Sequence, residues 1–438
     1  MKKKSLGLLE LVSIAVGGMV GGGIFTILGI SVSMVGFLAP FAIALGGLIA
    51  FFAAYSYVKL GVYYKDEGAT YAFFKRTYPD SHLAPSLIGW YTIFGYISTL
   101  ALYAYTFASY GISGFEFANN EIVRKAVAIG IIWLFAFVNL WSVKGMGKIE
   151  DVMVYTKLFI LFIISVALIY FSKINLYTFA TTLQHDFANS TVLAILTVSS
   201  VTFVAYEGFQ LVINAVNEME NPEKNIPRAI YGSLVLVAFI YFIISLGSVL
   251  AIPLEDLINN KEYALASGAK DIMGTLGENL VILGAVLATS SAISGTMFGS
   301  SRQMARIADD KYLPKLLTKR KNLIPTNAIL AMALTASILI FIGGLQLILE
   351  FGSITFLLVS LLMAIANFKI RKATNSHPIF ALVAIVGLVG GASLILWYEY
   401  QTQFEQLLFI LLLYVVLSIG AFGYAKFREF EDRKLEES

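Results

Sequence analysis

Five glycines lie within the short stretch VGGMVGGGIFT, between Val16 and Thr26. The stretch belongs to the first long apolar run of the chain, where a helix in lipid must satisfy its backbone polar groups internally. Glycine weakens a helix interior by about 0.5–1 kcal/mol relative to alanine. The cluster therefore predicts one of two features: a surface for close helix packing, or a deliberate break in the helix.

A break at this point could bind an anion. If the chain unwinds near residues 21–23, the next half-helix begins at about Ile24, and its first amides lack intrahelical acceptors. These amides carry the positive end of the helix dipole, which favours a carboxylate. A second interruption, FVAYEGFQ at Phe203–Gln210, frees carbonyls near Val204 and Glu207 that could accept from an ammonium group. The two sites together describe an α-amino acid.

Lys157 is the second candidate for chemistry, because it lies deep in the apolar run VMVYTKLFILFIISVALIYF. A lysine at bilayer depth costs about 2.5–3.5 kcal/mol even on lenient scales, which marks it as a functional candidate. The alternative is a lysine whose ammonium reaches the nearby membrane surface.

The composition indicates which elements must position these residues. The chain has 438 residues, of which 58% are hydrophobic and only 13% are charged, whereas an ordinary soluble domain has about 25% charged residues. We expect an all-α polytopic membrane protein embedded in a lipid bilayer. The apolar run that follows MKKKS is too long for a signal peptide, so it is expected to remain as the first helix.

Other classes of protein find little support. No basic stripe with interleaved aromatic residues is present, so no nucleic-acid partner is expected. The absence of cysteine excludes disulfides and thiolate sites, and His82, His185 and His377 fall in predicted loops without forming a metal cluster. No HExxH or GxSxG motif suggests a membrane enzyme, and no soluble effector domain suggests a sensor. We expect neither a cofactor nor a metal.

Hydropathy predicts twelve spans of about 20 residues each. They cover residues 8–30, 38–61, 84–112, 124–143, 151–172, 190–216, 228–251, 278–305, 327–345, 351–368, 379–398 and 404–425. With the N-terminus in the cytoplasm, 25 Lys and Arg residues fall on the cytoplasmic side and 5 on the outer side. This asymmetry predicts that both termini are cytoplasmic and that the protein is a multi-pass protein of the cytoplasmic membrane.

The interrupted spans one and six lie five spans apart, which is typical of an inverted-repeat transporter. We expect a first repeat over residues 1–172, a second over residues 190–372, and two appended helices over residues 379–425. Residues 426–438, which include EFEDRKLEES, are expected to form a polar, frayed cytoplasmic tail.

Several motifs resemble those of the amino acid–polyamine–organocation (APC) superfamily. GGGIF at Gly21–Phe25 is similar to its first-helix motif, and FVAYEGF at Phe203–Phe209 to its sixth-helix motif. NPEKNIPRAI at Asn221–Ile230 and ALASGAKDIMGTLG at Ala264–Gly277 resemble two of its loop motifs. The resemblance runs from about residue 5 to 372. It implies the LeuT-like fold, in which two inverted repeats of five helices hold the substrate at helices one and six.

The resemblance also implies roles for single residues. The substrate carboxylate is expected on the amides of Gly22, Gly23 and Ile24, beside Gly21. The substrate ammonium is expected on the carbonyls of Met19, Val204 and Glu207, beside Gly208, with Phe203 and Tyr206 as gating or lining aromatics. Lys157 would stand where sodium-coupled relatives bind Na⁺. Its ammonium would contact the carbonyl of Gly17 and the hydroxyl of Ser290 or Ser291.

Glu207 departs from the family pattern, because close relatives often have an apolar residue there, and Gln210 departs as well, because many relatives have glutamate. The Glu207 side chain could receive a cationic group of the substrate, take up a proton, or pair structurally.

The sequence as a whole predicts a secondary active transporter of amino acids that works by alternating access, coupled to protons and independent of sodium. An amino acid exchanger, or an antiporter of polyamines or cationic amino acids, on the same fold is the alternative.

Overall fold

The computed structural model describes residues 6–141, 146–172, 174–189, 191–321 and 324–436. Five of the residues that contribute to the charge asymmetry lie outside these ranges: Lys2, Lys3, Lys4, Lys144 and Lys173. Within them the chain is helical, and its only β-type contacts are two isolated bridges, Leu6 with Met219 and Lys321 with Ile324.

The long helices follow the apolar runs. They are α1 (Leu8–Met19), α2 (Gly23–Val35), α3 (Ala39–Tyr64), α5 (Leu83–Gly111), α6 (Glu121–Trp141), α7 (Met146–Tyr170), α9 (Val192–Val201), α11 (Pro222–Ala251), α13 (Ala264–Asp309), α14 (Thr326–Ile342), α15 (Leu345–Lys369), α16 (Pro378–Thr402) and α17 (Phe404–Glu436). Shorter elements connect them: η1 (Gly36–Leu38), α4 (Ala69–Thr77), α8 (Leu176–Asn189), η2 (Thr202–Tyr206), α10 (Leu211–Asn214), η3 (Val216–Glu218), α12 (Leu254–Asn259) and η4 (Lys315–Thr318).

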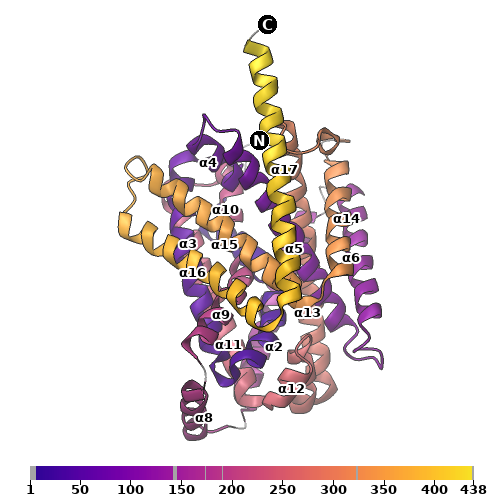
Figure 1. The fold of residues 1–438 in the computed structure, drawn as a ribbon. Coiled ribbons are helices and arrows are strands. Elements are labelled where there is room, and N and C mark those ends of the chain that lie inside the picture. The colour runs from indigo at the N-terminus through magenta and orange to yellow at the C-terminus, as the bar shows by residue number, and fades with distance from the viewer. Residues whose placement is uncertain (1–5, 142–145, 173, 190, 322–323, 437–438) are drawn as a thin grey trace.

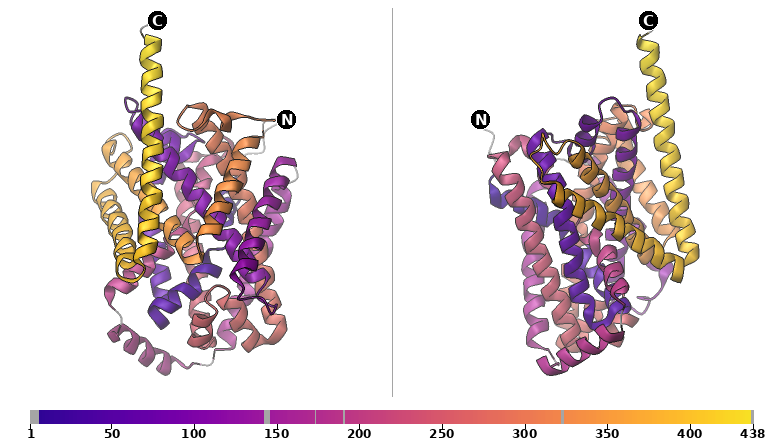
Figure 2. Two further views of the ribbon diagram at one scale, coloured as in Figure 1. Left: turned by 45° about the vertical axis from the view of Figure 1, so that its right-hand side comes forward. Right: turned by 60° about the vertical axis from the view of Figure 1, so that its left-hand side comes forward.

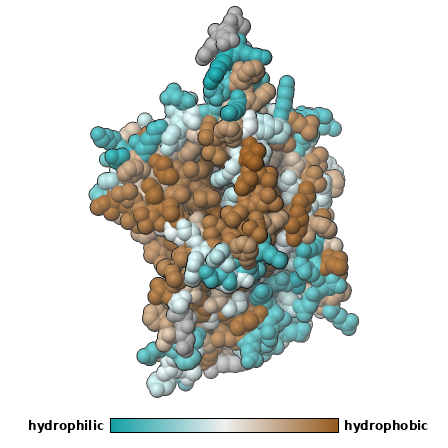
Figure 3. Space-filling model, viewed as in Figure 1, coloured by the Kyte–Doolittle hydropathy of each residue, from teal (hydrophilic) through white to brown (hydrophobic). Residues whose placement is uncertain are grey.

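The length and surface of these helices indicate a membrane protein. Among the described residues, nine helical segments are long and apolar enough to cross a membrane, with α2 and α3 counted as one continuous segment. Large apolar side chains point outward, and those of Phe137, Phe162 and Phe239 are 60%, 65% and 62% exposed. Figure 3 shows hydrophobic residues over much of the middle of the molecule and hydrophilic residues gathered toward its two ends. The predicted all-helical, polytopic membrane fold is confirmed at this level.

The helices form groups that meet around the two interrupted spans. Helix α1 packs on α11, which also packs on α3, whereas α13 packs on α5 and α7, and α14 packs on α6. Helix α2 contacts members of both groups, including α3, α5 and α13. Figures 1 and 2 show the chain termini and α4 toward one end of the bundle and α8 and α12 toward the other. We refer to these ends as the termini side and the opposite side.

Two details differ from the sequence-based expectation. The segment predicted as a frayed tail continues α17 as far as Glu436, because charges of opposite sign one turn apart support the helix. Arg428 contacts Asp432 at 3.0 Å, and Arg433 contacts Glu429 in the same way. His185, predicted in a loop, lies in α8, a short polar helix that a search for long apolar runs does not detect.

Candidate functional site

The first interruption separates α1 from α2. Helix α1 ends at Met19 and α2 begins at Gly23, so the first amides of α2 have no acceptors within their own helix. The glycines are also closely packed. A Cβ atom on Gly21 would lie 2.7 Å from the Cβ of Ala292 and 2.8 Å from a ring carbon of Tyr103. The cluster therefore serves as a break and as a packing surface at once.

The second interruption follows η2. Glu207 is extended, with φ −69° and ψ 142°, and Gly208 has a φ of +125° that favours glycine. A Cβ on Gly208 would lie 2.6 Å from the carbonyl carbon of Gly18. The two broken helices thus touch through their backbones, and only glycine at position 208 permits this approach.

Two tyrosines that the sequence did not single out hold the breaks. The hydroxyl of Tyr241, on α11, donates to the carbonyl of Met19 at 2.9 Å and lies 3.3 Å from the carbonyl of Ala205, so it joins both interrupted spans. The hydroxyl of Tyr103, on α5, lies 3.4 Å from the carbonyl of Gly18. No local motif distinguishes these residues among the 23 tyrosines of the chain.

A narrow cavity of about 30 Å³ lies beside the breaks. Its lining includes Gly18, Tyr103, Glu207, Gly208 and Gln210. A space of this size accommodates about one water molecule and is too small for an amino acid.

The predicted aromatic pair lies outside this lining. Phe203 is fully buried, and the hydroxyl of Tyr206 donates to the carbonyl of Ile43 on α3 at 2.8 Å. The predicted backbone ligands Met19, Gly21, Gly22, Gly23 and Ile24 are all buried at the first break.

Glu207 is a buried carboxyl group at the cavity, with only 4% of its surface exposed. Its Oε2 accepts from the side-chain amide of Gln210 at 2.9 Å, and Gln210 Oε1 accepts from the Gly208 amide at 3.0 Å. Glu207 Oε1 is buried and has no hydrogen-bond partner in the part of the chain that the structure describes. One carboxyl oxygen is therefore held in place, while the other is available to a ligand or a proton.

Lys157 is completely buried on α7. Its ammonium donates to the carbonyl of Gly17 on α1 at 3.0 Å and to the hydroxyl of Ser291 on α13 at 3.1 Å. Ser290, the other predicted hydroxyl, is buried next to Ser291. Lys157 thus connects three helices, one of which leads directly into the first break.

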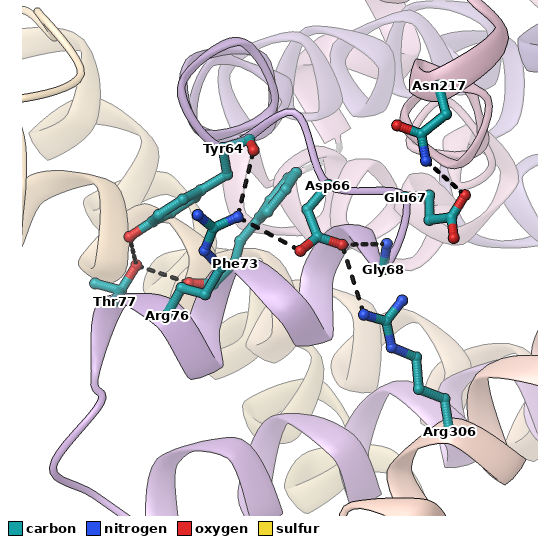
Figure 4. Close-up of polar contacts among 9 residues, drawn as sticks. All are labelled: Tyr64, Asp66, Glu67, Gly68, Phe73, Arg76, Thr77, Asn217 and Arg306. Atoms are coloured by element: carbon teal, nitrogen blue, oxygen red, sulfur yellow. Dashed lines mark hydrogen bonds and ion pairs between the residues drawn. The ribbon is translucent and has the colours of Figure 1, made fainter.

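Polar contacts close the termini side. Figure 4 shows Asp66 between Arg76 and Arg306, at 3.5 Å and 3.7 Å, with its Oδ1 also accepting from the Gly68 amide at 2.9 Å. The neighbouring Glu67 accepts from Asn217 at 2.8 Å, which ties the segment after α3 to the segment after α10.

The opposite side is closed by an ion pair between Arg124 on α6 and Glu262 just before α13, which we call the opposite-side latch. Their side chains are 4% and 24% exposed, and Arg124 also donates to the carbonyl of Ala118 at 2.7 Å. Burial raises the pKa of Glu262, and the Arg124 guanidinium offsets part of this rise. Next to the latch, the backbone of Lys261 packs directly on Gly29 of α2, where any Cβ would clash.

A metal centre finds no support in the described ranges, because no three His, Asp or Glu side chains gather there as ligands.

Comparison with known proteins identifies similar chains over nearly the whole length. The family model described as amino acid permease matches residues 6–422. An uncharacterised protein of Methanocaldococcus jannaschii is 28% identical over 405 residues, which cover 92% of this chain and 91% of that protein. The inner membrane transport protein YbaT of Escherichia coli is 27% identical over 88% of both chains. The serine/threonine exchanger SteT of Bacillus subtilis is 25% identical over 71% of this chain and 70% of its own.

Proposed function

We propose that this chain, which belongs to the amino acid permease family, is a secondary active transporter of amino acids. The members of this family transport amino acids. The proposed transporter couples uptake to protons and not to sodium. The substrate alternates between access from the two sides of the membrane while it is held at the paired breaks.

The proposed substrate site uses backbone groups for the part that all α-amino acids share. Amides at the start of α2, from Gly22 to Ile24, bind the carboxylate at the positive end of the helix dipole. The carbonyls of Met19, Val204 and Glu207 receive the ammonium. Val204 O accepts from the Glu207 amide at 3.1 Å, so the substrate uses its second lone pair. Met19 O already accepts from Tyr241 at 2.9 Å and from the Gly21 amide at 2.9 Å, so the substrate ammonium replaces one of these donors.

Proton coupling is supported by the position of Lys157. Its buried ammonium lies in a polar position between α1, α7 and α13. A coupling cation bound there would have to contact the same three helices. Carbonyl and hydroxyl contacts favour the charged lysine, while burial opposes it. A lysine that loses these contacts when α1 moves can release its proton, so the transport cycle and the protonation cycle are linked.

The same proposal includes the topology. Twelve spans form two inverted repeats of five helices, followed by α16 and α17, with both termini in the cytoplasm and the bundle in the cytoplasmic membrane. The termini side is then the cytoplasmic face, and the opposite-side latch lies on the outer face.

An exchanger remains the second candidate, because a relative of similar length is named as a serine/threonine exchanger. A carrier of cationic amino acids or polyamines is a variant of either candidate, since Glu207 Oε1 is an unpaired acceptor at the proposed site.

Uptake by the purified protein in proteoliposomes tests the proposal. Labelled amino acids and polyamines are offered with an inward proton gradient or an inward sodium gradient. We expect uptake to follow the proton gradient alone, and Lys157→Gln to lose that dependence while retaining some exchange. The matched control is Lys125→Gln. Lys125 lies away from the breaks and forms an ion pair with Glu121 at 2.9 Å. A requirement for sodium in the wild type would contradict proton coupling, and counterflow without any gradient would favour the exchanger.

A further inference from the structure

Two further glutamates lie buried against each other, away from the breaks. Glu350 is on α15 and Glu399 is on α16, and both side chains have no exposed surface. Their carboxyl groups lie close enough to interact with each other. Figures 1 and 2 show α15, α16 and α17 together on one flank of the bundle, with α16 turning into α17 away from the chain termini.

The surroundings of the pair differ between its two members. Glu350 Oε1 accepts from the side-chain amide of Gln346 at 2.9 Å, and Oε2 accepts from that of Gln406 on α17 at 2.5 Å. Neither oxygen of Glu399 has an N–H or O–H partner in the described part of the chain. Glu399 is therefore an unpartnered buried carboxyl group whose neighbour is another carboxyl group.

This arrangement requires a proton. Two carboxylates have only acceptor oxygens, so a hydrogen bond between them exists only if one of them is protonated. Two buried negative charges in contact would also lose solvation, at several kcal/mol each, and repel each other. Because amide donors stabilise Glu350 as a carboxylate, Glu399 is the group that holds the proton and donates it to Glu350.

Charged groups nearby do not replace this proton. Lys261, from the segment before α13, attracts the negative charge of Glu350 but forms no ion pair with either glutamate within the described residues. Tyr398 of α16 is the other titratable side chain that faces the pair. A metal cation is disfavoured, because two N–H donors occupy the Glu350 oxygens that it would need.

A surface pocket lies beside the pair. This pocket of about 340 Å³ is lined by Lys261, Gln346 and Tyr398, so Gln346 contacts both the pocket and Glu350. The pocket provides a route by which a proton can exchange with solvent.

We propose that Glu350 and Glu399 form a proton-binding site, separate from the substrate breaks and from Lys157, in which one shared proton joins α15 to α16 and α17. The proposal does not depend on which substrate the protein carries or on whether Lys157 couples transport to protons.

Contacts along α15 connect this site to the interrupted spans. The hydroxyl of Ser353, one turn after Glu350, donates to the carbonyl of Val201 at 2.5 Å, immediately before η2. The carbonyl of Ile348 accepts from Ser98 of α5 at 2.8 Å. Loss of the shared proton leaves two buried carboxylates in contact and drives α16 away from α15. This movement changes the contact between α15 and the residue that precedes η2.

Infrared spectroscopy of the purified, full-length protein detects the proton directly. A protonated glutamate has a C=O band distinct from that of a carboxylate, and labelling all glutamates with ¹³C assigns the band to this residue type. In the Glu207→Gln background, which removes the other unpaired buried carboxyl group among the described residues, we expect a glutamic acid band at neutral pH that disappears when Glu399→Gln is added. Glu278→Gln is the matched control, because Glu278 is buried but paired with Lys270 at 3.1 Å and should have no acid band to lose.

The Glu207→Gln protein keeps the pair intact while removing the buried carboxyl group at the break. It must therefore still show a glutamic acid band at neutral pH, even if the variants at positions 350 and 399 do not fold. Absence of that band would overturn the proposal, and so would its persistence in a folded protein that carries both Glu207→Gln and Glu399→Gln.

Unfolding experiments provide an independent measurement. The folded pair holds a proton that the unfolded chain releases at neutral pH, so the pair favours folding less as the pH rises. One proton corresponds to about a tenfold change in the folding equilibrium per pH unit. We expect Glu399→Gln, which resembles the protonated form in shape, to lose this part of the pH dependence. An unchanged slope in that variant would contradict the shared proton.

Discussion

Glu207 combines two environments in one carboxyl group. Its Oε2 is fixed by Gln210 at 2.9 Å, whereas Oε1 faces the break without a partner in the described residues. A buried acceptor left unpaired costs about 1–3 kcal/mol, and more if it is charged. The structure therefore favours a role in which a substrate cation or a proton completes the site, over a purely structural pairing.

Glu207→Gln separates these two roles, because it preserves the shape of the side chain and removes its charge. If the carboxylate binds a cationic side chain, affinity for cationic substrates falls at least tenfold at every pH, while neutral substrates are unaffected. If it binds a proton, all substrates keep their affinity and the pH profile of uptake shifts. Binding and uptake measured across a pH series decide between them, with Glu278→Gln as a control for removing a buried glutamate elsewhere. No change in substrate preference, affinity or pH profile would leave only the structural role.

The sequence indicated residues whose chemistry is unusual for their depth in the membrane. Lys157 and Glu207 were detectable because an ionisable group in an apolar run is costly, and the glycines because they weaken a helix. Tyr241 and Tyr103 were not detectable, since a buried tyrosine is ordinary in such a chain. Their importance comes from how α5 and α11 cross the breaks, which is a property of tertiary packing.

The two interrupted spans depend on each other, because Gly18 and Gly208 touch through their backbones. Gly208→Ala introduces a Cβ at a φ of +125° and 2.6 Å from the Gly18 carbonyl carbon. A side chain in such a strained conformation costs about 1–3 kcal/mol, so we expect a lower unfolding temperature and weaker substrate binding.

The control for this prediction is Gly232→Ala on α11, where an added Cβ meets nothing within 4 Å. Alanine in that helix should be neutral or stabilise the protein by up to about 1 kcal/mol. Thermal unfolding in detergent measures both variants. Equal stability of the two would show that the contact between the breaks does not constrain residue 208.

At the level of elements, apolar run length predicted where the membrane helices lie, and both interruptions are present at the predicted residues. The short elements α4, α8 and α12 were missed, because a helix of 6 to 14 residues at the membrane surface needs no long apolar run. The helical continuation of α17 was missed because its support comes from charge pairs and from Lys311, which contacts Glu431 at 2.5 Å across the chain.

Polar contacts join elements on both sides of the breaks. The Asp66 contacts in Figure 4 join elements on the termini side, and the latch of Arg124 and Glu262 joins α6 to the segment before α13 on the opposite side. The order in which these closures open was not predictable from the sequence. An ion pair between residues 124 and 262 depends on the packing of elements that are far apart in the chain.

The opposite-side latch gives a prediction for the whole molecule. The chain has no cysteine, so Thr106→Cys provides a single reactive thiol beside Thr26, where the two hydroxyls are 2.5 Å apart in the wild type. On this background, Glu262→Gln leaves the buried Arg124 charge unpaired, which is strongly unfavourable and should favour opening. We expect the thiol to react with a water-soluble maleimide several-fold faster. Lys125→Gln removes a partly exposed ion pair with Glu121 on the same helix, worth about 0–1 kcal/mol, and should leave the rate unchanged.

The same thiol should report a dependence on pH. Because burial raises the pKa of Glu262, its carboxylate is neutralised at a higher pH than that of an ordinary glutamate as the solution is acidified. Neutralisation removes the partner of Arg124, so labelling of the Thr106→Cys protein, corrected for the reactivity of free thiol, should rise as the pH falls. The Glu262→Gln protein has already lost this charge and should show no such rise. Equal pH dependence in the two proteins would mean that the latch does not control access from the opposite side. Closure there would then rest on the packing of Lys261 against Gly29.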